Sequence, residues 1–169
     1  MDAVEAILSR RSIRKYTSKP VPDELIEELL RAAMSAPSAG NEQPWHFVVI
    51  RDRRILNEIP KFHDYSQMLN EASVAVLVCA DLKEQRHEGF WIQDCSAATQ
   101  NILVAAHARG LGAVWLGVYP VQKRIDGLRK LLGIPDHVMP LSLISIGYPA
   151  EQKPTADRYD ASRIHNDHW

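Results

Sequence analysis

Apolar residues recur every three or four positions in several parts of the chain, which is the period of a helix with one buried face. The clearest example is residues 23–34, where acidic residues open the pattern and Pro37 ends it. The same period predicts a short helix over residues 2–9, and a surface helix is expected over residues 51–60. Three helices are therefore expected in the first 60 residues.

Two further helices are expected in the second half of the chain. Residues 90–109 form the longest helical pattern, which closes at Gly110, and residues 121–132 form another that ends at Gly133. Alanines occupy much of the circumference of the longer helix. Small residues on several sides allow close packing, as expected of a helix in the core of a dimer.

Strand patterns separate these helices. Residues 45–50 and 113–117 predict two strands, and residues 74–80 are continuously apolar and rich in β-branched residues, as in a strand covered on both faces. Residues 138–146 predict a fourth strand, although Pro140 restricts it, because proline in a strand favours an edge or the first position. Neither a repeat nor a linker interrupts residues 1–169, so we predict a single α+β domain.

The composition and charge of the chain argue against some classes of function. The net charge is −1, which argues against nucleic acid as the main partner, and the longest apolar run is far shorter than the ~18 residues that a membrane span needs. The N-terminus resembles neither a secretory signal nor a transit peptide, so a cytoplasmic protein is expected. Cys79 and Cys95 form no CxxC pair and are interpreted as small buried residues.

Cations gather near the N-terminus, where the first 19 residues contain only Asp2 and Glu5 as acids. A charge run is often just a solvated surface. Here, however, arginines flank Ser12 directly after a predicted helix, and guanidinium groups beside a hydroxyl can hold a phosphate through charge-assisted hydrogen bonds. We therefore predict a phosphate-bearing ligand. The cations are Arg10, Arg11, Arg14, Lys15 and Lys19.

Other sites are less well supported. The chain has no GxxxxGK loop, and the glycines at 110 and 112 come after a helix rather than after a strand, so a dinucleotide fold is not expected. Most histidines are scattered, and His165 and His168 share a tail with only Asp167 in support, which does not predict a metal site. No GxSxG elbow indicates a hydrolase.

Three motifs taken together closely resemble the nitroreductase family. They are RRSIRKY at 10–16, PSAGNEQPWHF at 37–47 and GLGAVWLG at 110–117. A fourth element, Gly147-Tyr148-Pro149 followed by Lys153, Pro154 and Arg158, is similar to the family's C-terminal signature. The resemblance covers nearly the whole chain in the expected order.

This resemblance implies a nitroreductase-like fold, with a mixed β-sheet flanked by helices, and an intertwined homodimer that binds FMN at the subunit interface. By position, five residues of one subunit are expected at the phosphate, the ribityl chain and the ring edge of FMN. They are Arg10, Arg11, Ser12, Arg14 and Arg158. The partner subunit is expected to contribute Pro37, Ser38, Ala39 and Asn41.

The resemblance also implies the surroundings of the flavin ring. Leu116 and Gly117 match the segment that offers backbone N–H groups to flavin N5, and Gln67 lies near the pyrimidine ring. Longer family members often carry a basic residue there, whereas this chain has Met68, which leaves Arg14 as the expected cation near N1 and O2. Trp91, Trp115 and Tyr119 could line the acceptor pocket, although core packing is the favoured interpretation for both tryptophans.

The implied activity is that of an FMN-dependent oxidoreductase, in which NADH or NADPH donates electrons and a small acceptor such as a nitroaromatic or a quinone then takes them. No catalytic side chain is expected, since the hydride chemistry belongs to the flavin. Two alternatives stay open. One is a specialised flavin reaction, such as dehalogenation, flavin fragmentation or ring dehydrogenation, and the other is a non-catalytic flavin-binding protein.

Overall fold

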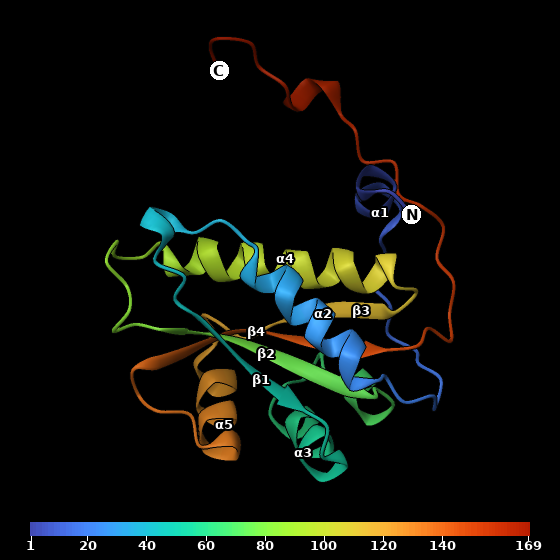
Figure 1. Cartoon of the computed structure of the whole chain (residues 1–169), viewed down its shortest axis with the longest axis vertical. Coiled ribbons are helices and arrows are strands. Elements are labelled where there is room, and N and C mark those ends of the chain that lie inside the picture. Colours follow the sequence, from blue (N-terminus) through green and yellow to red (C-terminus); the bar gives the residue numbers. More distant parts are fainter.

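The computed structural model describes all 169 residues and is built around one four-stranded sheet in the order β1-β2-β4-β3 (Figure 1). The strands are β1 (Trp45–Ile50), β2 (Val74–Asp81), β3 (Gly112–Gly117) and β4 (Val138–Gly147). The helices are α1 (Ala3–Ser9), α2 (Asp23–Met34), α3 (Arg53–Glu58), α4 (Trp91–Ala108) and α5 (Gln122–Leu132). Every one of these elements lies within two residues of its predicted bounds, which confirms the α+β class.

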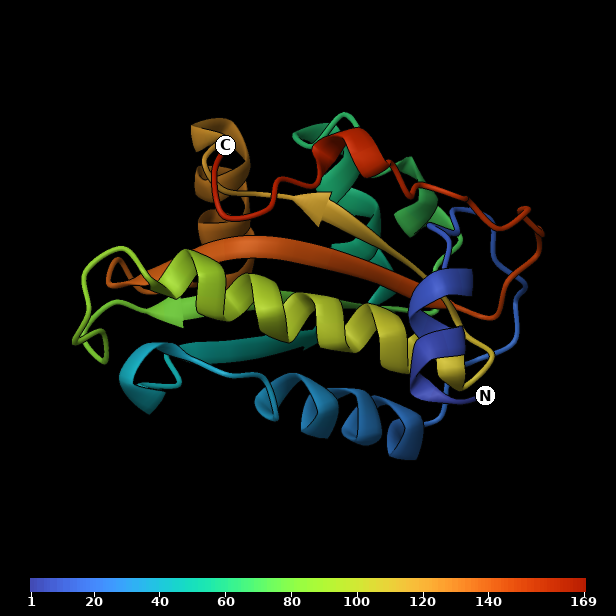
Figure 2. The ribbon, with the colours of Figure 1, turned by 90° about the horizontal axis from the view of Figure 1, so that it is seen from above.

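Helices cover both faces of the sheet. Figure 2 shows α2 and α4 on one side, with α3 and α5 on the other. Strand β2 joins the two layers, because Val76 and Val78 belong to the apolar cluster under α2 and α4, whereas Leu77 and Cys79 belong to the cluster with α3 and α5. The expected burial of β2 on both faces is confirmed.

Pro140 lies inside a central strand, which corrects the expectation of an edge or first position. Strand β4 is paired on both sides, but its register with β2 shifts between Val78 and Cys79, and Cys79 is opposite Pro140. A β-bulge leaves a backbone position without a ladder hydrogen bond, so proline is tolerated there.

The outer edge of β3 is partly covered by the segment that follows α1. The four strands pair antiparallel, and parallel pairing is confined to a bridge between Ser12 and Ala113, where the N–H of Ile13 donates to the Ala113 carbonyl at 3.0 Å. Gly112 makes this approach possible, since a Cβ there would lie 2.6 Å from Cγ2 of Ile13. The arginine-rich segment is thus fixed along the sheet edge.

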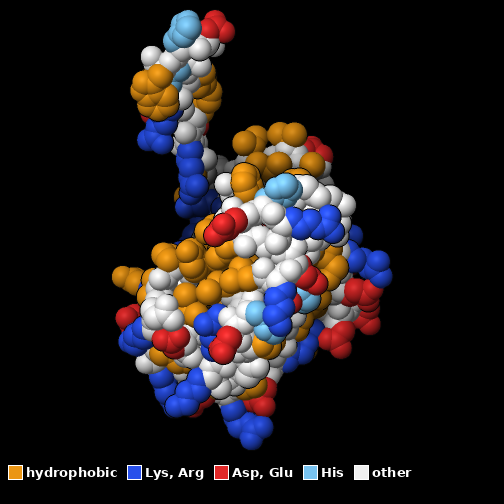
Figure 3. Space-filling model, turned by 90° about the vertical axis from the view of Figure 1, so that its left-hand side faces the viewer, with side chains coloured by type: hydrophobic (Ala, Val, Ile, Leu, Met, Phe, Trp, Pro, Cys, Tyr) orange, Lys and Arg blue, Asp and Glu red, His pale blue; other side chains and the backbone are white.

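Both ends of the chain project from this body. Figure 1 shows α1 and the C-terminal segment extending away from the sheet, and Figure 3 shows hydrophobic side chains on the projecting segment. On α1 the side chains of Val4, Ile7 and Leu8 are 65%, 57% and 69% exposed. These apolar groups are left without a partner in a single chain.

The two cysteines are free and buried, as expected. Burial raises the pKa of the Cys79 thiol to about 12, and it also raises the pKa of Cys95. Both thiols therefore stay protonated and behave as apolar packing groups. None of the helices combines the length and the apolar character needed to cross a lipid bilayer.

Candidate functional site

A pocket of about 430 Å³ opens beside the uncovered end of β3. Four of the residues expected around a flavin ring line it together, although they come from three separate parts of the chain. They are Arg14, Gln67, Leu116 and Gly117. Met68 lines the same pocket, so no basic side chain from residues 67–70 enters it.

The direction of each residue along β3 shows which backbone N–H groups face this pocket. The carbonyls of Ala113 and Gly117 bond outward, away from β4, and residues of an antiparallel strand alternate in direction. Because the N–H and C=O of one residue point the same way, the Gly117 N–H faces outward and the Leu116 N–H faces β4. Of the two expected donors, Gly117 is the one directed to the pocket.

Two side chains that the sequence did not single out hold this strand end in place. His63 Nε2 lies 3.0 Å from the Gly117 carbonyl oxygen, and a guanidinium nitrogen of Arg124 donates to the same oxygen at 2.8 Å. His63 is only 1% exposed, and burial together with Arg124 lowers its pKa, so the ring is neutral and Nε2–H donates. Nothing in the sequence separates this histidine from the other six.

Trp115 differs from its expected position in the core. It belongs to the edge strand β3, where its side chain is 36% exposed and lines the pocket. Trp91 is buried, as expected, and packs edge-to-face on Tyr119 with ring centroids 5.0 Å apart. Alternation along the strand decides the difference for Trp115, because its neighbours Val114 and Leu116 point into the core.

A second cavity, of about 690 Å³, brings Arg10 and Arg158 together between α1 and the C-terminal segment. Burial, Arg158 and Arg11 lower the pKa of Arg10. Glu5 and Asp157 line the same cavity, but neither carboxylate forms an ion pair with Arg10 or Arg158. Arg11 lines a neighbouring depression with Lys153, whose ammonium donates to the Ser12 carbonyl at 2.9 Å. Lys153 also pairs with Glu151 at 3.2 Å, so Arg11 is the cation of this depression that has no ion pair.

The four arginines expected at the site form no ion pairs. No carboxylate oxygen lies within 4.0 Å of the guanidinium groups of Arg10, Arg11, Arg14 or Arg158, whereas five other arginines form such pairs. Those five are Arg31, Arg51, Arg54, Arg109 and Arg163. Guanidinium groups that have no carboxylate partner and lie near one another are available for phosphate oxygens.

The loop that contains Pro37, Ser38, Ala39 and Asn41 does not join either pocket. The Ala39 N–H donates to Asp94 in the first turn of α4, whereas the Ser9 hydroxyl, next to the arginines, bonds His107 in the last turn. Since α4 has 18 residues and is about 27 Å long, the loop and the segment next to Arg10 and Arg11 lie near opposite ends of this helix.

Two buried carboxyl groups lie next to this loop, and neither was predicted from the sequence. Glu42 is 8% exposed and Asp94 is 4% exposed, and each has one oxygen without another hydrogen-bond partner, Oε1 and Oδ2 respectively. Glu42 belongs to a loop motif and Asp94 to an apolar helix face. Their proximity depends on the tertiary fold, so no spacing along the chain could indicate it.

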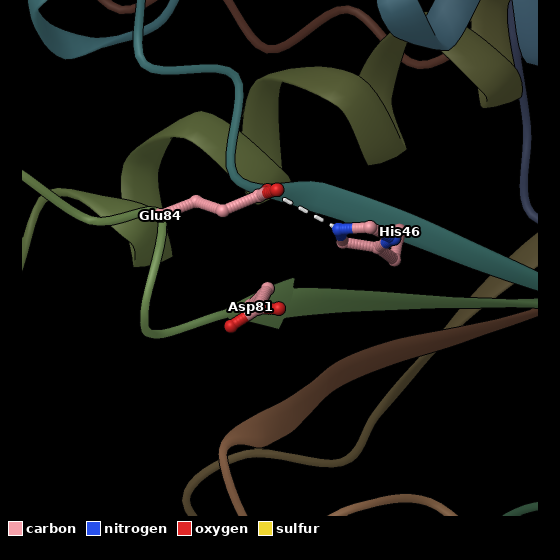
Figure 4. A group of neighbouring side chains, drawn as sticks. All are labelled: His46, Asp81 and Glu84. Carbon is pink, nitrogen blue, oxygen red and sulfur yellow. Dashed lines mark hydrogen bonds and ion pairs between the residues drawn. The ribbon is translucent and has the colours of Figure 1, made fainter.

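A third cluster lies near one end of β1 and β2 (Figure 4). His46 Nε2 is 3.2 Å from a carboxylate oxygen of Glu84. One potential metal-ligand atom from each of His46, Asp81 and Glu84 lies within 4.8 Å of the other two. The sequence had suggested only scattered histidines. Asp81 also accepts the N–H of Lys83 at 2.8 Å, so the cluster connects the residues after β2 to the sheet.

Known proteins are similar to this chain over most of its length. A family model described as the nitroreductase family matches residues 7–65 and 63–148. A protein of Methanothermobacter thermautotrophicus, provisionally named an NADH dehydrogenase/NAD(P)H nitroreductase, is 54% identical over 169 residues, which cover 100% of this chain and 88% of that protein.

Solved structures are similar over the same length. A protein of Parabacteroides distasonis with that same provisional name aligns with a TM-score of 0.95 at 42% identity, covering 99% of this chain and 98% of its own. A nitroreductase from Desulfovibrio desulfuricans in complex with FMN, also provisionally named, aligns with a TM-score of 0.86 at 34% identity, covering 100% and 98%.

Proposed function

The chain belongs to the nitroreductase family, and from this premise we propose that it is an FMN-dependent oxidoreductase that passes electrons from NADH or NADPH to small acceptors. The observation that carries the proposal is a set of arginines that form no ion pairs. Arg10 and Arg158 line one cavity, and Arg14 lines the pocket beside β3. The relatives support it, since they include an FMN reductase from Bacillus subtilis and a structure described as a complex with FMN.

The residues present fit the phosphate of FMN. Arg10 and Arg158 share one cavity and neither forms an ion pair there, so a dianion that lies between them would relieve their mutual repulsion. In the proposed site Arg11 and Ser12 complete the polar shell around the phosphate and the ribityl chain. In this proposal residues 1–169 form a single domain, because α1, the sheet edge and the C-terminal segment all contribute to the phosphate site.

The pocket beside β3 fits the ring of the flavin. Arg14 places a positive charge at one wall, and the Gly117 N–H faces the space from another. In the proposed site Arg14 stabilises negative charge at N1 and O2, Gln67 contacts the pyrimidine edge, and Gly117 orients N5. Leu116 contributes an apolar contact from the strand end.

When bound, FMN supplies the hydride chemistry, and the chain has to bind, orient and polarise it. Electrons would arrive as hydride from the nicotinamide, and the oxidised nicotinamide would leave before the acceptor enters the same face. His63 and Arg124 both bond the carbonyl oxygen of Gly117, and these bonds hold the Gly117 N–H in one orientation during both steps. No side chain is required to form a covalent bond.

We propose that the site needs two chains. The loop residues Pro37, Ser38, Ala39 and Asn41 would complete it from the partner subunit, since their own chain holds them about one helix length from the arginines. The exposed apolar face of α1 and the projecting C-terminal segment supply surfaces for such a homodimer. We expect the protein to act in the cytoplasm.

An anaerobic titration of the purified protein tests the proposal. FMN should copurify or be taken up in a ratio of one per chain, and NADH or NADPH should bleach its absorption, after which a quinone or a nitroaromatic should restore it. A protein that cannot be loaded with FMN would contradict the proposal. Bound FMN that neither nicotinamide reduces would instead favour a flavin-binding protein without this activity.

A further inference from the structure

Glu42 and Asp94 bring two carboxyl groups together where water is almost excluded. Glu42 lies between the turn Ala39–Asn41 and β1, and Asp94 lies in the first turn of α4. Burying two negative charges side by side is very unfavourable, because neither ion is solvated and the two repel each other. The remaining partners of each carboxyl show how the pair avoids this.

Each carboxyl has one oxygen engaged by the backbone. Oε2 of Glu42 accepts the N–H groups of Arg86 and His87 at 2.7 and 3.0 Å, and Oδ1 of Asp94 accepts the N–H of Ala39 at 3.0 Å. The other oxygens, Oε1 of Glu42 and Oδ2 of Asp94, are buried and have no hydrogen-bond donor, and the two carboxyl groups interact with each other. A proton between these two oxygens satisfies both and removes one charge.

We propose that Glu42 and Asp94 share a single proton and that this carboxylic acid–carboxylate pair positions the loop that contacts FMN. Asp94 carries the proton and donates it to Glu42, which has two backbone donors to stabilise its charge. This inference rests on the proposed function only for the identity of the ligand. The pair itself is a property of the folded chain.

The surrounding groups agree with this assignment. Burial and the neighbouring Glu42 raise the pKa of Asp94, whereas the pKa of Glu42, although burial opposes it, is lowered by the N–H groups of Arg86 and His87. His87 is the other titratable side chain that acts on both carboxyls, and it comes from the segment between β2 and α4. Its ring also packs against Gly40, where a Cβ would lie 2.4 Å from Nε2.

The pair therefore joins three segments at one buried point: the loop 37–44, the residues before α4, and α4 itself. Losing the shared proton would release Ala39 and its neighbours, which are the residues proposed to reach FMN in the partner subunit. Glu42 and Asp94 are thus positioning residues. They touch no reacting atom.

Amide substitutions give a test whose outcome depends on the single proton. In Asp94→Asn the new amide donates to Glu42 and still accepts from Ala39, and in Glu42→Gln the new amide donates to an ionised Asp94. Each single variant therefore keeps every hydrogen bond. The double variant places two NH₂ groups face to face, so at least one buried donor is left unsatisfied.

We expect each single variant to bind FMN within about twofold of the wild type and the double variant to bind at least about tenfold more weakly, the effect of one unsatisfied buried group. Amide hydrogen exchange at Ala39, Arg86 and His87 should be faster only in the double variant. Glu84→Gln is the matched control, since it makes the same change to an exposed carboxylate of the same segment, which pairs with His46, and should change neither quantity.

Infrared spectroscopy tests the proton directly and does not depend on FMN or on the double variant folding. The wild type should show a protonated carboxylic acid band that shifts in D₂O and is lost in both single variants. A wild type without this band would overturn the proposal, as would a single variant as impaired as the double. Failure of the wild type to bind FMN would refute the proposed function, while the band and the exchange rates would still decide on the pair.

Discussion

Arg14 lines the pocket beside β3 together with Arg124, and its guanidinium is the group proposed to face the flavin ring. It has no carboxylate partner, although its backbone N–H donates to Glu151 at 2.6 Å. A charged hydrogen bond contributes about 1.5–3 kcal/mol, so Arg14→Ala should weaken FMN binding by roughly 10- to 100-fold or slow flavin reduction by NAD(P)H. FMN fluorescence titration and anaerobic stopped-flow absorbance measure the two effects.

Arg31→Ala serves as the control for Arg14, because Arg31 forms an exposed pair with Glu27 on α2. Its loss should leave both FMN affinity and flavin reduction unchanged. If Arg14→Ala behaves like this control in both measurements, its proposed role beside the ring is wrong.

His63 adds a pH dependence to the stability of the fold. Burial and Arg124 lower its pKa in the folded chain, whereas the unfolded chain takes up the proton below the ordinary value of about 6.5. The unfolded state therefore binds more protons in acid, and the free energy of unfolding should fall as pH drops from about 7 to about 5. Urea unfolding at several pH values should show a loss on the order of 1 kcal/mol from this residue.

His63→Gln should flatten that dependence, since its amide can still donate to Gly117 but cannot titrate. Burial and Arg10 also lower the pKa of His107, so His107→Gln should remove a further part of the slope. An unchanged slope in both His63→Gln and His107→Gln would contradict the assignment.

At the scale of elements, the two glycines flanking Leu111 have different tasks. Gly110 ends α4 with a positive φ of 72°, as expected of a helix cap, whereas Gly112 makes room for Ile13. A methyl group at 112 would lie 2.8 Å from Cβ of Ile13, which cannot swing away. Gly112→Ala should therefore destabilise the chain by about 1–3 kcal/mol and weaken FMN binding, because it displaces the arginine segment.

A second substitution checks this reason. Ile13→Ala removes the atoms that the new methyl group would strike, so the double variant should regain part of the lost stability and FMN affinity relative to Gly112→Ala. Thermal unfolding and FMN titration of the four proteins give the coupling. Strictly additive losses would show that the contact between Gly112 and Ile13 does not hold the segment.

The elements could be predicted because their signals are local. Periodicity, Pro37 and the two cap glycines mark the helices, and β-branched runs mark the strands. The exception is Pro140, where a bulge depends on how β2 pairs with β4. The strand order and the exposure of Trp115 could not be predicted in this way, because only the assembled sheet shows that β3 is an edge strand.

At the scale of the whole molecule, the sequence predicts the parts of the site but not their distances. The motifs named the arginines, the loop and the end of β3, yet no spacing along the chain indicated that His63 and Arg124 would meet on Gly117 or that Glu42 would meet Asp94. Such contacts join residues far apart in the chain. The proposed division of the site between two chains likewise rests on a tertiary feature, the separation of the loop from Arg10 and Arg11 along α4.

That division leads to a prediction about mixed dimers. A chain carrying Arg10→Ala and Arg14→Ala should fail to hold FMN, and so should a chain carrying Ser38→Ala and Asn41→Ala. In a heterodimer of the two, one site combines both defects, whereas the other combines the intact arginines of one chain with the intact loop of its partner. The heterodimer should therefore regain about half the FMN content of the wild-type dimer.

Coexpression of the two chains with different affinity tags, followed by sequential purification, isolates this heterodimer. FMN content and NAD(P)H oxidation are then measured beside the two defective homodimers, which serve as controls. A site built within one chain would carry a defect in each subunit, so the heterodimer would stay as empty as the homodimers. Recovery in the heterodimer alone can arise only if FMN contacts the arginines of one chain and the loop of the other, since neither chain contains an intact set of both.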